Sequence, residues 1–391
     1  MNRIEIGHPA LPGQAGEGAV SRVILAGGGH AHLAVLADWA RHEFPNTQRV
    51  LVTASRFTAY SGLLPAWMAG ICRRQDLMID LEPLARKAGT TLIIDRVCGL
   101  DADKRTLLLA GGLALEFDLL SLATGGEADL SALASLGPRV LAVKPVDDFM
   151  QGWAVLVAKV RAGACIRLAV VGGGAAGVEM ALAAEVALRG IGSPVALIVP
   201  QGEFLKGHAD GVRRRVLAEF ARRGIALHHG HAVGAQDGLL LSDGISLPAS
   251  HVIAATGSRA PSWLARSGLR TTDAGFVAVG ADLRSVSHPN ILAAGDIVER
   301  IDRLLPRSGV HAVKSGPVLA ANLRAALADR PMRTYRPRER TLYLMATGER
   351  RAIGSWGKLA FGGRLAWWLK NWIDRRFIAR QRPGGPPDAL Q

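Results

Sequence analysis

The stretch Leu168-Ala-Val-Val-Gly-Gly-Gly-Ala-Ala-Gly-Val-Glu179 joins a short apolar run to a helical pattern through spaced glycines. Gly172, Gly174 and Gly177 match G-x-G-x-x-G, a pattern that forms a tight turn, lets the backbone approach a pyrophosphate and packs a helix closely on its strand. The helix that follows, to about residue 189, would direct its free N–H groups at the phosphates. Glycine-rich turns also join strands to helices without a ligand, so this motif alone leaves both interpretations open.

A second, weaker copy lies upstream, where residues 23–32 read Val-Ile-Leu-Ala-Gly-Gly-Gly-His-Ala-His. His32 replaces the third glycine, and we expect its bulk to hold the helix slightly off the strand. The second strand of this unit ends at Thr53, where an acid usually holds an adenosine ribose. A hydroxyl can make one hydrogen bond there, but the bidentate contact is lost. Two such units suggest two nucleotides bound face to face.

Both units end in a strand followed by Ala-Thr-Gly, at residues 123–125 and 255–257, which gives an internal repeat of about 130 residues. We therefore predict an α/β protein with two Rossmann-like dinucleotide-binding domains and a small C-terminal region with an amphipathic helix. The predicted parts are a flexible leader (1–20), a discontinuous first domain (21–145 and 260–330), a second domain (146–259) and the C-terminal region (331–391).

The remaining elements follow from hydrophobic periodicity and turn residues. A buried strand begins at Ile291 and ends in Gly295-Asp296. Further helices are predicted at 31–42, 147–161, 210–224 and 310–329, strands at 20–26, 50–54, 195–199, 226–229, 341–345 and 351–355, and hairpins around Gly111-Gly112 and Asp243-Gly244.

Bulk composition narrows the class of protein. The chain has 391 residues, 49% of them hydrophobic, but no run of about 18 uncharged apolar residues that could span a bilayer. The first twenty residues lack the apolar core of a signal peptide, so we expect a cytoplasmic protein.

The three cysteines, Cys72, Cys98 and Cys165, do not pair at C-x-x-C or similar spacing. This argues against a disulfide framework, a dithiol redox centre and a zinc site, and we expect no metal.

The net charge of +14 is concentrated near the C-terminus, since residues 330–391 hold fourteen Lys/Arg and four Asp/Glu. Such a basic tail favours binding to an anionic membrane surface, to nucleic acid or to an acidic partner, or else it forms a solvated face.

Within this tail, residues 363–382 form an amphipathic pattern that could lie in a bilayer interface or pack on the first domain. We expect no nucleic-acid partner. The residues that recur at helical spacing are Leu365, Trp368, Leu369, Trp372, Ile373, Arg376 and Phe377, and Arg364, Lys370, Arg375, Arg380 and Arg382 lie elsewhere on the wheel or at its rim.

The order of these motifs, over about residues 22–380, resembles the two-domain flavoproteins of the pyridine nucleotide-disulfide oxidoreductase superfamily. The resemblance is closest to the type II NADH dehydrogenase and sulfide:quinone oxidoreductase branch. The runs Gly29-His-Ala-His32, Tyr60-Ser-Gly-Leu-Leu-Pro65 and Lys370-Asn-Trp-Ile-Asp-Arg-Arg-Phe377 resemble the NADH-dehydrogenase-like subgroup that is sometimes fused to selenide, water dikinase.

The resemblance implies FAD on the first unit and NAD(P)H on the second. Asp296 would accept a hydrogen bond from a ribityl hydroxyl or a bridged phosphate, and the helix from Val310 would direct its positive end at the flavin, favouring the reduced form by roughly 1 kcal/mol. The implied FAD-binding residues are Gly27, Gly28, Gly29, His30, Thr53, Ala123, Thr124, Gly125, Gly295, Asp296 and Val310, and those for NAD(P)H are Gly172, Gly174, Gly177, Thr256 and Gly257.

Three residues are candidates for the chemistry. Glu179 would lie beside the reacting rings and could orient the carboxamide or move a proton to an acceptor. Lys144 would lie near flavin N5, and Lys314 would add positive charge one turn into its helix. A helix-dipole glutamate, a linker lysine and a solvated helix lysine remain the alternatives.

We thus expect an FAD-dependent NAD(P)H oxidoreductase that passes electrons to an acceptor, with a quinone as the first candidate. Two alternatives stay open: a soluble reductase for a small redox protein or a sulfur or selenium species, and a low-turnover redox sensor. An Ala-Gln pair expected on the quinone side is Gly309-Val310 here, and no acid marks NADH over NADPH. The lack of a cysteine pair argues against a thiol relay. The expected location is cytoplasmic, or peripheral at the inner face of the plasma membrane, and the oligomeric state stays open.

Overall fold

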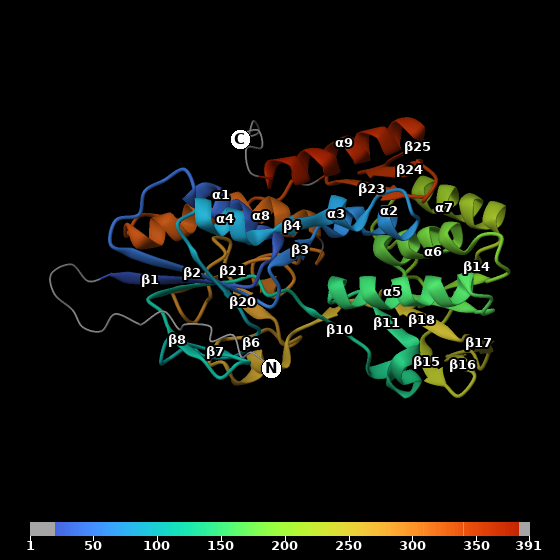
Figure 1. Ribbon diagram of the computed structural model, residues 1–391, viewed down its shortest axis with the longest axis horizontal. Helices are drawn as coiled ribbons and strands as arrows, with labels where there is room; N and C mark the ends of the chain where they lie inside the picture. The colour runs from blue at the N-terminus through green and yellow to red at the C-terminus, as the bar shows by residue number, and fades with distance from the viewer. Residues whose placement is uncertain (1–19, 308, 339, 383–391) are drawn as a thin grey trace, which may run out of the picture.

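The computed structural model describes residues 20–307, 309–338 and 340–382. The predicted leader therefore lies outside the described residues, apart from Val20. Figure 1 shows two α/β halves side by side along the longest axis, with the C-terminal region lying across the top of both.

The first half is built on a five-stranded parallel sheet in the order β21-β9-β1-β2-β5. Alternate residues of β1 face two different cores, as in a parallel sheet covered on both sides. Helices α1 and α8 cover one face, and the antiparallel strands β6, β7 and β8 lie on the other. The strands are β1 (Ser21–Ala26), β2 (Thr47–Thr53), β5 (Thr91–Ile94), β9 (Leu119–Leu122), β21 (Ile291–Ala293), β6 (Val97–Asp101), β7 (Thr106–Leu109) and β8 (Ala114–Glu116), and the helices are α1 (His30–Trp39) and α8 (Gly309–Leu327).

The second half repeats this plan. Its parallel sheet has the order β11-β18-β12-β13-β14, so that β12 takes the place of β1. The repeat extends to single hydrogen bonds: Gly27 N–H donates to Val52 O at 2.7 Å, and Gly172 N–H donates to Ile198 O at 3.0 Å. The elements are β11 (Val140–Ala142), β12 (Leu168–Val171), β13 (Val195–Val199), β14 (Ala226–His229), β18 (His251–Ala254), the antiparallel β15 (Ala232–Ala235), β16 (Gly238–Leu241) and β17 (Ser246–Pro248), and the helices α5 (Val146–Arg161), α6 (Ala175–Leu188) and α7 (Asp210–Arg223).

These two halves confirm the predicted pair of Rossmann-like folds. The chain crosses between them twice, and the crossings β10 (Glu127–Ala128) and β19 (Ser258–Arg259) pair as an antiparallel ribbon. β11 is hydrogen-bonded in the second sheet although it precedes residue 146. The domain boundaries therefore stay a proposal. Smaller elements are β3 (Phe57–Ala59), β4 (Met78–Asp80), β20 (Val277–Val279), β22 (Val298–Arg300), α4 (Leu81–Lys87), η1 (Ser61–Leu63), η2 (Ser131–Arg139) and η3 (Ser262–Arg266).

The C-terminal region joins the two halves. Its antiparallel sheet packs β23 (Leu342–Ala346) against α6 and β25 (Leu359–Gly363) against α7, with β24 (Ala352–Trp356) between them. Helix α9 (Arg364–Arg380) lies over this sheet and extends above α2 (Leu64–Met68) and α3 (Arg74–Leu77) of the first half (Figure 1). This arrangement brings three distant parts of the chain together at one junction.

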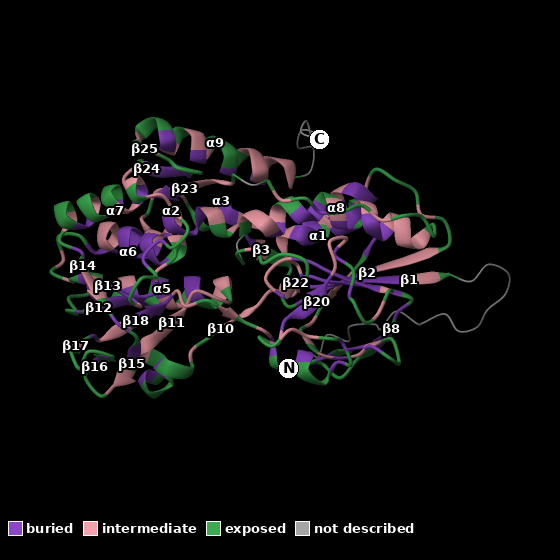
Figure 2. Cartoon of the chain, turned by 180° about the vertical axis from the view of Figure 1, so that it is seen from behind, coloured by how far each residue is buried: buried purple, intermediate pink, exposed green. Residues whose placement is uncertain are grey.

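Helix α9 buries a different face from the one that the sequence suggests. Its buried residues are Ala366, Lys370, Asp374 and Ile378, whereas Trp368 is 62% exposed and Trp372 is 47% exposed. Figure 2 shows the exposed outer surface of this helix. The alternative in which the tryptophans of this helix pack on the protein itself is therefore wrong for Trp368 and Trp372. Lys370 does not lie at a solvated rim, because it is buried. No helix in the described ranges is long and apolar enough to span a bilayer.

Candidate functional site

The first glycine loop is held against the end of β9 so closely that side chains are excluded. A Cβ added at Gly27 would lie 2.5 Å from Ala123 O, and one at Gly29 would lie 2.4 Å from the same atom. A Cβ at Gly28 would lie 2.8 Å from Thr53 Oγ1. The backbone contacts thus require glycine at Gly27 and Gly29, whereas the atoms nearest a Cβ at Gly28 belong to the Thr53 and Leu81 side chains.

The second glycine loop uses the same contact. A Cβ at Gly172 would lie 2.3 Å from Ala255 O, and one at Gly177 would lie 2.0 Å from Gly172 O. In contrast, a Cβ at Gly174 would meet no described atom within 4 Å. Gly172 and Gly177 therefore hold the helix on its strand, whereas Gly174 leaves open space where a phosphate could lie.

Polar atoms without partners lie beside the first glycine loop, and both loops lead into uncapped helices. His30 Nε2 and Thr124 Oγ1 are buried, and within the described residues neither has a hydrogen-bond partner. Helices α1 and α6 begin after Gly29 and Gly174 with no side-chain cap on their free N–H groups. Buried polar groups are normally satisfied, so these atoms fit a dinucleotide that supplies the missing acceptors and donors.

Asp296 and Lys144 form an ion pair at the end of β21. Lys144 Nζ also donates to Ser258 Oγ at 2.7 Å, so the linker lysine ties the chain crossing to Asp296. Gly295 has φ +82, a conformation that favours glycine. The structure thus brings together two residues that the sequence treats separately, one for FAD and one for the chemistry.

Other predicted residues have contacts within the protein. Thr53 Oγ1 donates to Ser55 O at 3.1 Å, and Thr256 Oγ1 donates to Asp129 O at 2.9 Å. A Cβ at Gly125 or Gly257 would meet nothing within 4 Å. Their roles toward a cofactor stay predictions.

Helix α8 begins beside the first glycine unit. A Cβ at Gly309 would lie 3.5 Å from Ser61 Oγ, and a Cβ at Gly295 would lie 3.7 Å from the Ala312 side chain. Val310 therefore lies at a helix start close to Gly295 and Asp296, and its role toward the flavin stays a prediction. Burial and then the charge of Arg338 lower the pKa of Lys314. No described interaction joins Lys314 to Glu179 or Lys144.

Glu179 is half-buried in a polar cluster at the junction of the three parts. Its Oε1 accepts a hydrogen bond from the Ala346 N–H of β23 at 2.7 Å. Burial raises the pKa of Glu179 to about 7, although Lys370 and the Ala346 N–H oppose that rise. A carboxyl group with this pKa can exchange a proton near neutral pH.

Lys370, Asp374 and Tyr60 complete this cluster, and they are the residues that the sequence analysis missed. Lys370 Nζ donates to Asp374 Oδ2 at 2.9 Å and to Gly62 O at 2.8 Å, and Tyr60 Oη donates to Asp374 Oδ1 at 3.0 Å. Burial alone would lower the pKa of Lys370, but Glu179 and Asp374 outweigh burial and raise it. The available signal was the i, i+4 spacing of a lysine and an aspartate inside a helix rich in apolar residues.

Aromatic rings link this cluster to the first glycine loop. Tyr60 stacks on Phe377 of α9 with ring centroids 4.5 Å apart, and the His30 ring meets the Tyr60 ring edge-on at 5.7 Å. Burial lowers the pKa of His30, so the imidazole is neutral. Tyr60 of the polar cluster therefore contacts His30, the residue whose Nε2 has no partner within the described residues.

A cavity of about 600 Å³ opens between α9 and the first half of the chain. Its lining includes Gly62, Cys72, Ala346, Lys370, Asp374 and Arg375. Burial raises the pKa of the Cys72 thiol to about 11, so it would not act as a thiolate nucleophile. Among the residues that the structure describes, no group of His, Cys, Asp and Glu is arranged to hold a metal ion.

Two known proteins are similar in sequence to this chain over about half of its length or more. Ferroptosis suppressor protein 1 of Homo sapiens is 29% identical over 276 residues, which are 66% of this chain and 69% of that protein. The ferredoxin–NAD(+) reductase component of the p-cumate 2,3-dioxygenase system of Pseudomonas putida is 34% identical over 210 residues, 52% of this chain and 49% of that protein.

Among solved structures, sulfide:quinone oxidoreductase of Aquifex aeolicus has a TM-score of 0.77 at 19% identity, covering 93% of this chain and 92% of that one. At this identity the similarity concerns the fold. The model of the pyridine nucleotide-disulphide oxidoreductase family matches residues 21–316. The chain therefore belongs to the pyridine nucleotide-disulphide oxidoreductase family and is an FAD-dependent NAD(P)H oxidoreductase.

Proposed function

We propose that this oxidoreductase reduces a quinone bound in the cavity beneath α9. The observation that carries the proposal is the polar cluster of Glu179, Lys370, Asp374 and Tyr60: Lys370 and Asp374 line that cavity. Glu179 accepts its hydrogen bond from Ala346, which also lines the cavity. Quinone reduction takes up two electrons and two protons, so the site must supply protons as well as electrons. When bound, FAD supplies two-electron transfer between the nicotinamide and the acceptor.

We assign proton donation to Glu179 and binding of the second acceptor oxygen to Lys370. Glu179 Oε1 is engaged by the Ala346 N–H, which leaves Oε2 to carry a proton and give it to an acceptor oxygen. Lys370 has three N–H donors, of which two contact Gly62 O and Asp374, so the third can bind the other acceptor oxygen. The proton given by Glu179 is replaced from solvent, and NAD(P)H with one proton reduces the quinone to the quinol.

The shape of the site favours a small acceptor over a protein. A cavity of about 600 Å³ lies in the range of small-molecule sites. A ferredoxin would instead need a docking surface. The similarity to a ferredoxin reductase makes a ferredoxin the competing candidate for the acceptor.

We also assign Gly27–Gly29, Thr124 and Asp296 to FAD, and Gly172, Gly174 and Gly177 to NAD(P)H.

We further propose that α9 lies on a membrane surface that holds the quinone. Leu365, Trp368, Trp372 and Ile373 expose apolar area on the outer side of this helix, and Leu359 of β25 is 61% exposed beside it. Tryptophan and arginine on one amphipathic helix suit an interface with anionic lipids. Vesicles with and without anionic lipid test this, because a soluble reductase would pellet with neither.

Anaerobic stopped-flow spectroscopy tests the acceptor. NADH is expected to bleach the yellow flavin absorbance, and a soluble short-chain quinone is expected to allow fast reoxidation. Glu179→Gln should slow reoxidation by about a hundredfold, whereas Glu116→Gln, at an exposed carboxylate on β8, should not. Faster reoxidation by a ferredoxin than by the quinone would refute the proposal, and very slow bleaching by NADH would favour a sensor.

A further inference from the structure

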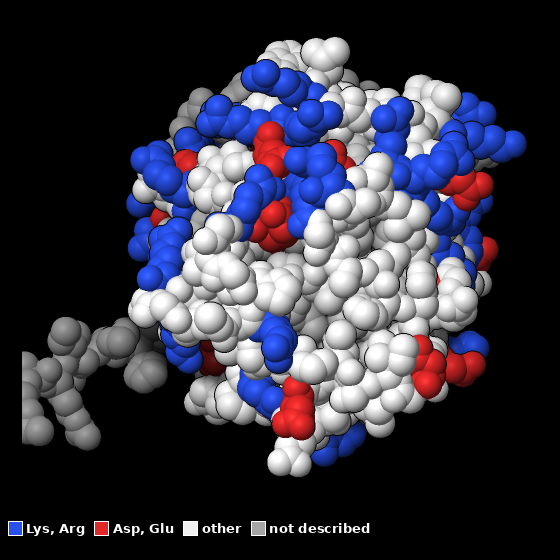
Figure 3. Space-filling model, turned by 90° about the vertical axis from the view of Figure 1, so that its right-hand side faces the viewer, with Lys and Arg blue, Asp and Glu red and all other residues white. Residues whose placement is uncertain are grey.

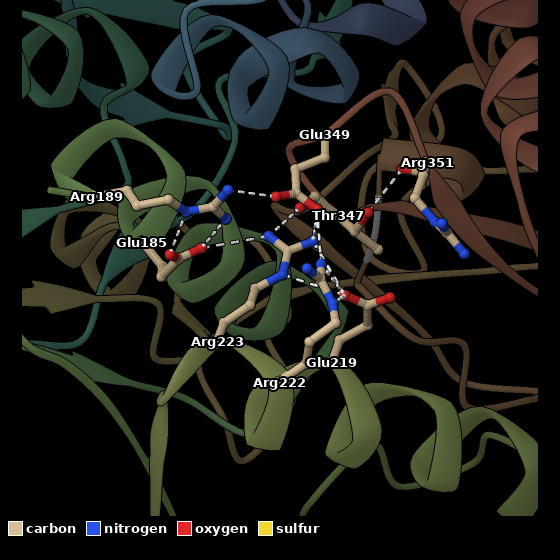
Figure 4. Close-up of polar contacts among 8 residues, drawn as sticks. All are labelled: Glu185, Arg189, Glu219, Arg222, Arg223, Thr347, Glu349 and Arg351. Atoms are coloured by element: carbon tan, nitrogen blue, oxygen red, sulfur yellow. Dashed lines mark hydrogen bonds and ion pairs between the residues drawn. The ribbon is translucent and has the colours of Figure 1, made fainter.

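A cluster of ion pairs fastens the C-terminal sheet to the second half of the chain (Figure 4). Arg223 of α7 is its centre: the side chain is 1% exposed and pairs with Glu185 at 3.4 Å, Glu219 at 3.1 Å and Glu349 at 2.9 Å. Its guanidinium also donates to Thr347 O at 2.7 Å. Figure 3, which faces this end of the molecule, shows basic side chains crowded over its upper part with carboxylates among them.

Glu349 is the contribution of the C-terminal region to this cluster. It lies in the turn between β23 and β24 and receives Arg189 at 2.5 Å and Arg222 at 2.6 Å as well as Arg223. Burial opposes ionisation of Glu349, but hydrogen bonds from Arg189 and Arg222 and the charge of Arg223 lower its pKa to about 2. The carboxylate is therefore charged throughout the neutral range.

The same turn ends on Glu179. Ala346, the last residue of β23, donates its N–H to Glu179, and the turn closes through Thr347 N–H to Arg351 O at 2.9 Å. A Cβ at Gly348 would lie 2.9 Å from the Val186 side chain on α6, the helix that carries Glu179. The turn thus lies directly on α6, with Glu349 in its middle and the Ala346 contact with Glu179 just before it.

We infer that Glu349 is a positioning residue, which through the β23–β24 turn keeps the Ala346 N–H on the Glu179 carboxylate. This inference rests on the proposed function of Glu179 as the proton donor. The other groups that face Glu179 are Lys370 and Asp374 of α9 and Tyr60 of the first half. Their hydrogen bonds join Lys370, Asp374, Tyr60 and Gly62 and involve no residue of the turn, so we expect loss of Glu349 to remove one interaction and leave these in place.

The C-terminal sheet also contacts the second half of the chain through residues outside the Glu349 ion pairs, so a change confined to the turn can be measured. His208 Nδ1 lies 3.0 Å from Ser355 Oγ, and the His208 ring meets the Tyr343 ring edge-on at 5.2 Å. Loss of the Glu349 charge should therefore loosen the turn without detaching the sheet.

The test compares Glu349→Gln with Glu116→Gln in the holoenzyme. Hydrogen exchange measured by mass spectrometry should rise in the peptide that spans the turn in Glu349→Gln only. The pH midpoint of flavin reoxidation by a soluble quinone, set by Glu179 near 7, should rise by about one unit, because loss of a charge-assisted hydrogen bond favours the protonated form. Arg222→Gln, which removes one of three contacts to Glu349, should shift the midpoint less in the same direction.

The outcomes separate the two ideas. If exchange rises but the midpoint stays, or if neither changes, Glu349 is not a positioning residue. In a Glu179→Gln background the midpoint should vanish, and Glu349→Gln should add nothing. If Glu179→Gln keeps the wild-type profile, the proposed function of Glu179 fails and the inference fails with it. If that profile changes while Glu349→Gln leaves the midpoint in place, only the inference fails.

Discussion

His32 occupies the third glycine position of the first motif, and its replacement gives a quantitative test of the fold. The side chain is 1% exposed, with Nδ1 2.6 Å from Gly27 O and Nε2 2.8 Å from Ser121 Oγ. Because a carbonyl only accepts, Nδ1 carries the hydrogen and donates to Gly27 O, and Nε2 accepts from Ser121. The imidazole therefore does not simply hold the helix off the strand. It joins the glycine loop to β9.

His32→Ala would leave the Gly27 carbonyl and the Ser121 hydroxyl buried without this partner. Each unsatisfied group costs about 1–3 kcal/mol, and the vacated imidazole volume adds a cavity term. We therefore expect the free energy of unfolding to fall by about 3–5 kcal/mol. His32→Gly, which restores the third glycine of the motif, should be at least as destabilising, because glycine adds a helix penalty of about 1 kcal/mol.

The same residue predicts a dependence of stability on pH. Burial lowers the pKa of His32 to about 4, whereas the unfolded chain titrates near 6.5. Stability is full above the unfolded pKa and falls as pH decreases, because only the unfolded chain then takes up the proton. The loss amounts to about 2 kcal/mol between about pH 7 and about pH 5.

Urea unfolding of the holoenzyme, followed by fluorescence at both pH values, measures these quantities. His42→Ala is the matched control, because the His42 side chain is 41% exposed and its ring interacts with Asp38 of the same helix end. The reasoning is refuted if His32→Ala is as stable as the wild type, or if it keeps the whole wild-type loss of stability at the lower pH.

Three further predictions concern the cofactor and acceptor sites. Gly177→Ala should lower the free energy of unfolding by about 2 kcal/mol through overpacking. Gly174→Ala should keep the melting temperature and lower the affinity for NADH about tenfold or more, because its methyl group fills only the open side of the loop. Thermal unfolding and isothermal titration with NADH distinguish the two variants. Lys370→Met should raise the pKa values of Glu179 and Asp374, move the pH profile of quinone reduction upward and lower its rate about tenfold. Arg364→Gln, at an exposed residue of α9 that does not line the cavity, should do neither, and an unchanged profile in Lys370→Met would contradict this. Trp368→Ser should weaken pelleting with anionic vesicles by several fold while NADH-dependent flavin reduction stays intact, and equal pelleting of both proteins would exclude that face.

The sequence by itself determined the local elements and their repeat. Strands β13 and β14 lie at the predicted residues, α8 and α7 end within about two residues of prediction, and both glycine turns meet their Ala-Thr-Gly strands. These features follow from periodicity and turn chemistry over a few residues, and such patterns survive any tertiary arrangement. The resemblance carried by the motif order supplied the family and its two cofactors.

The tertiary structure alone decided where the C-terminal region lies. Periodicity shows that residues 364–380 form a helix, but both of its faces carry apolar and charged side chains, so the pattern does not indicate which one is buried. The contacts of Glu179 with Ala346, of Tyr60 with Asp374 and of Arg223 with Glu349 join segments more than a hundred residues apart. No local pattern encodes such pairs, because they depend on how the two halves and the C-terminal region pack against one another.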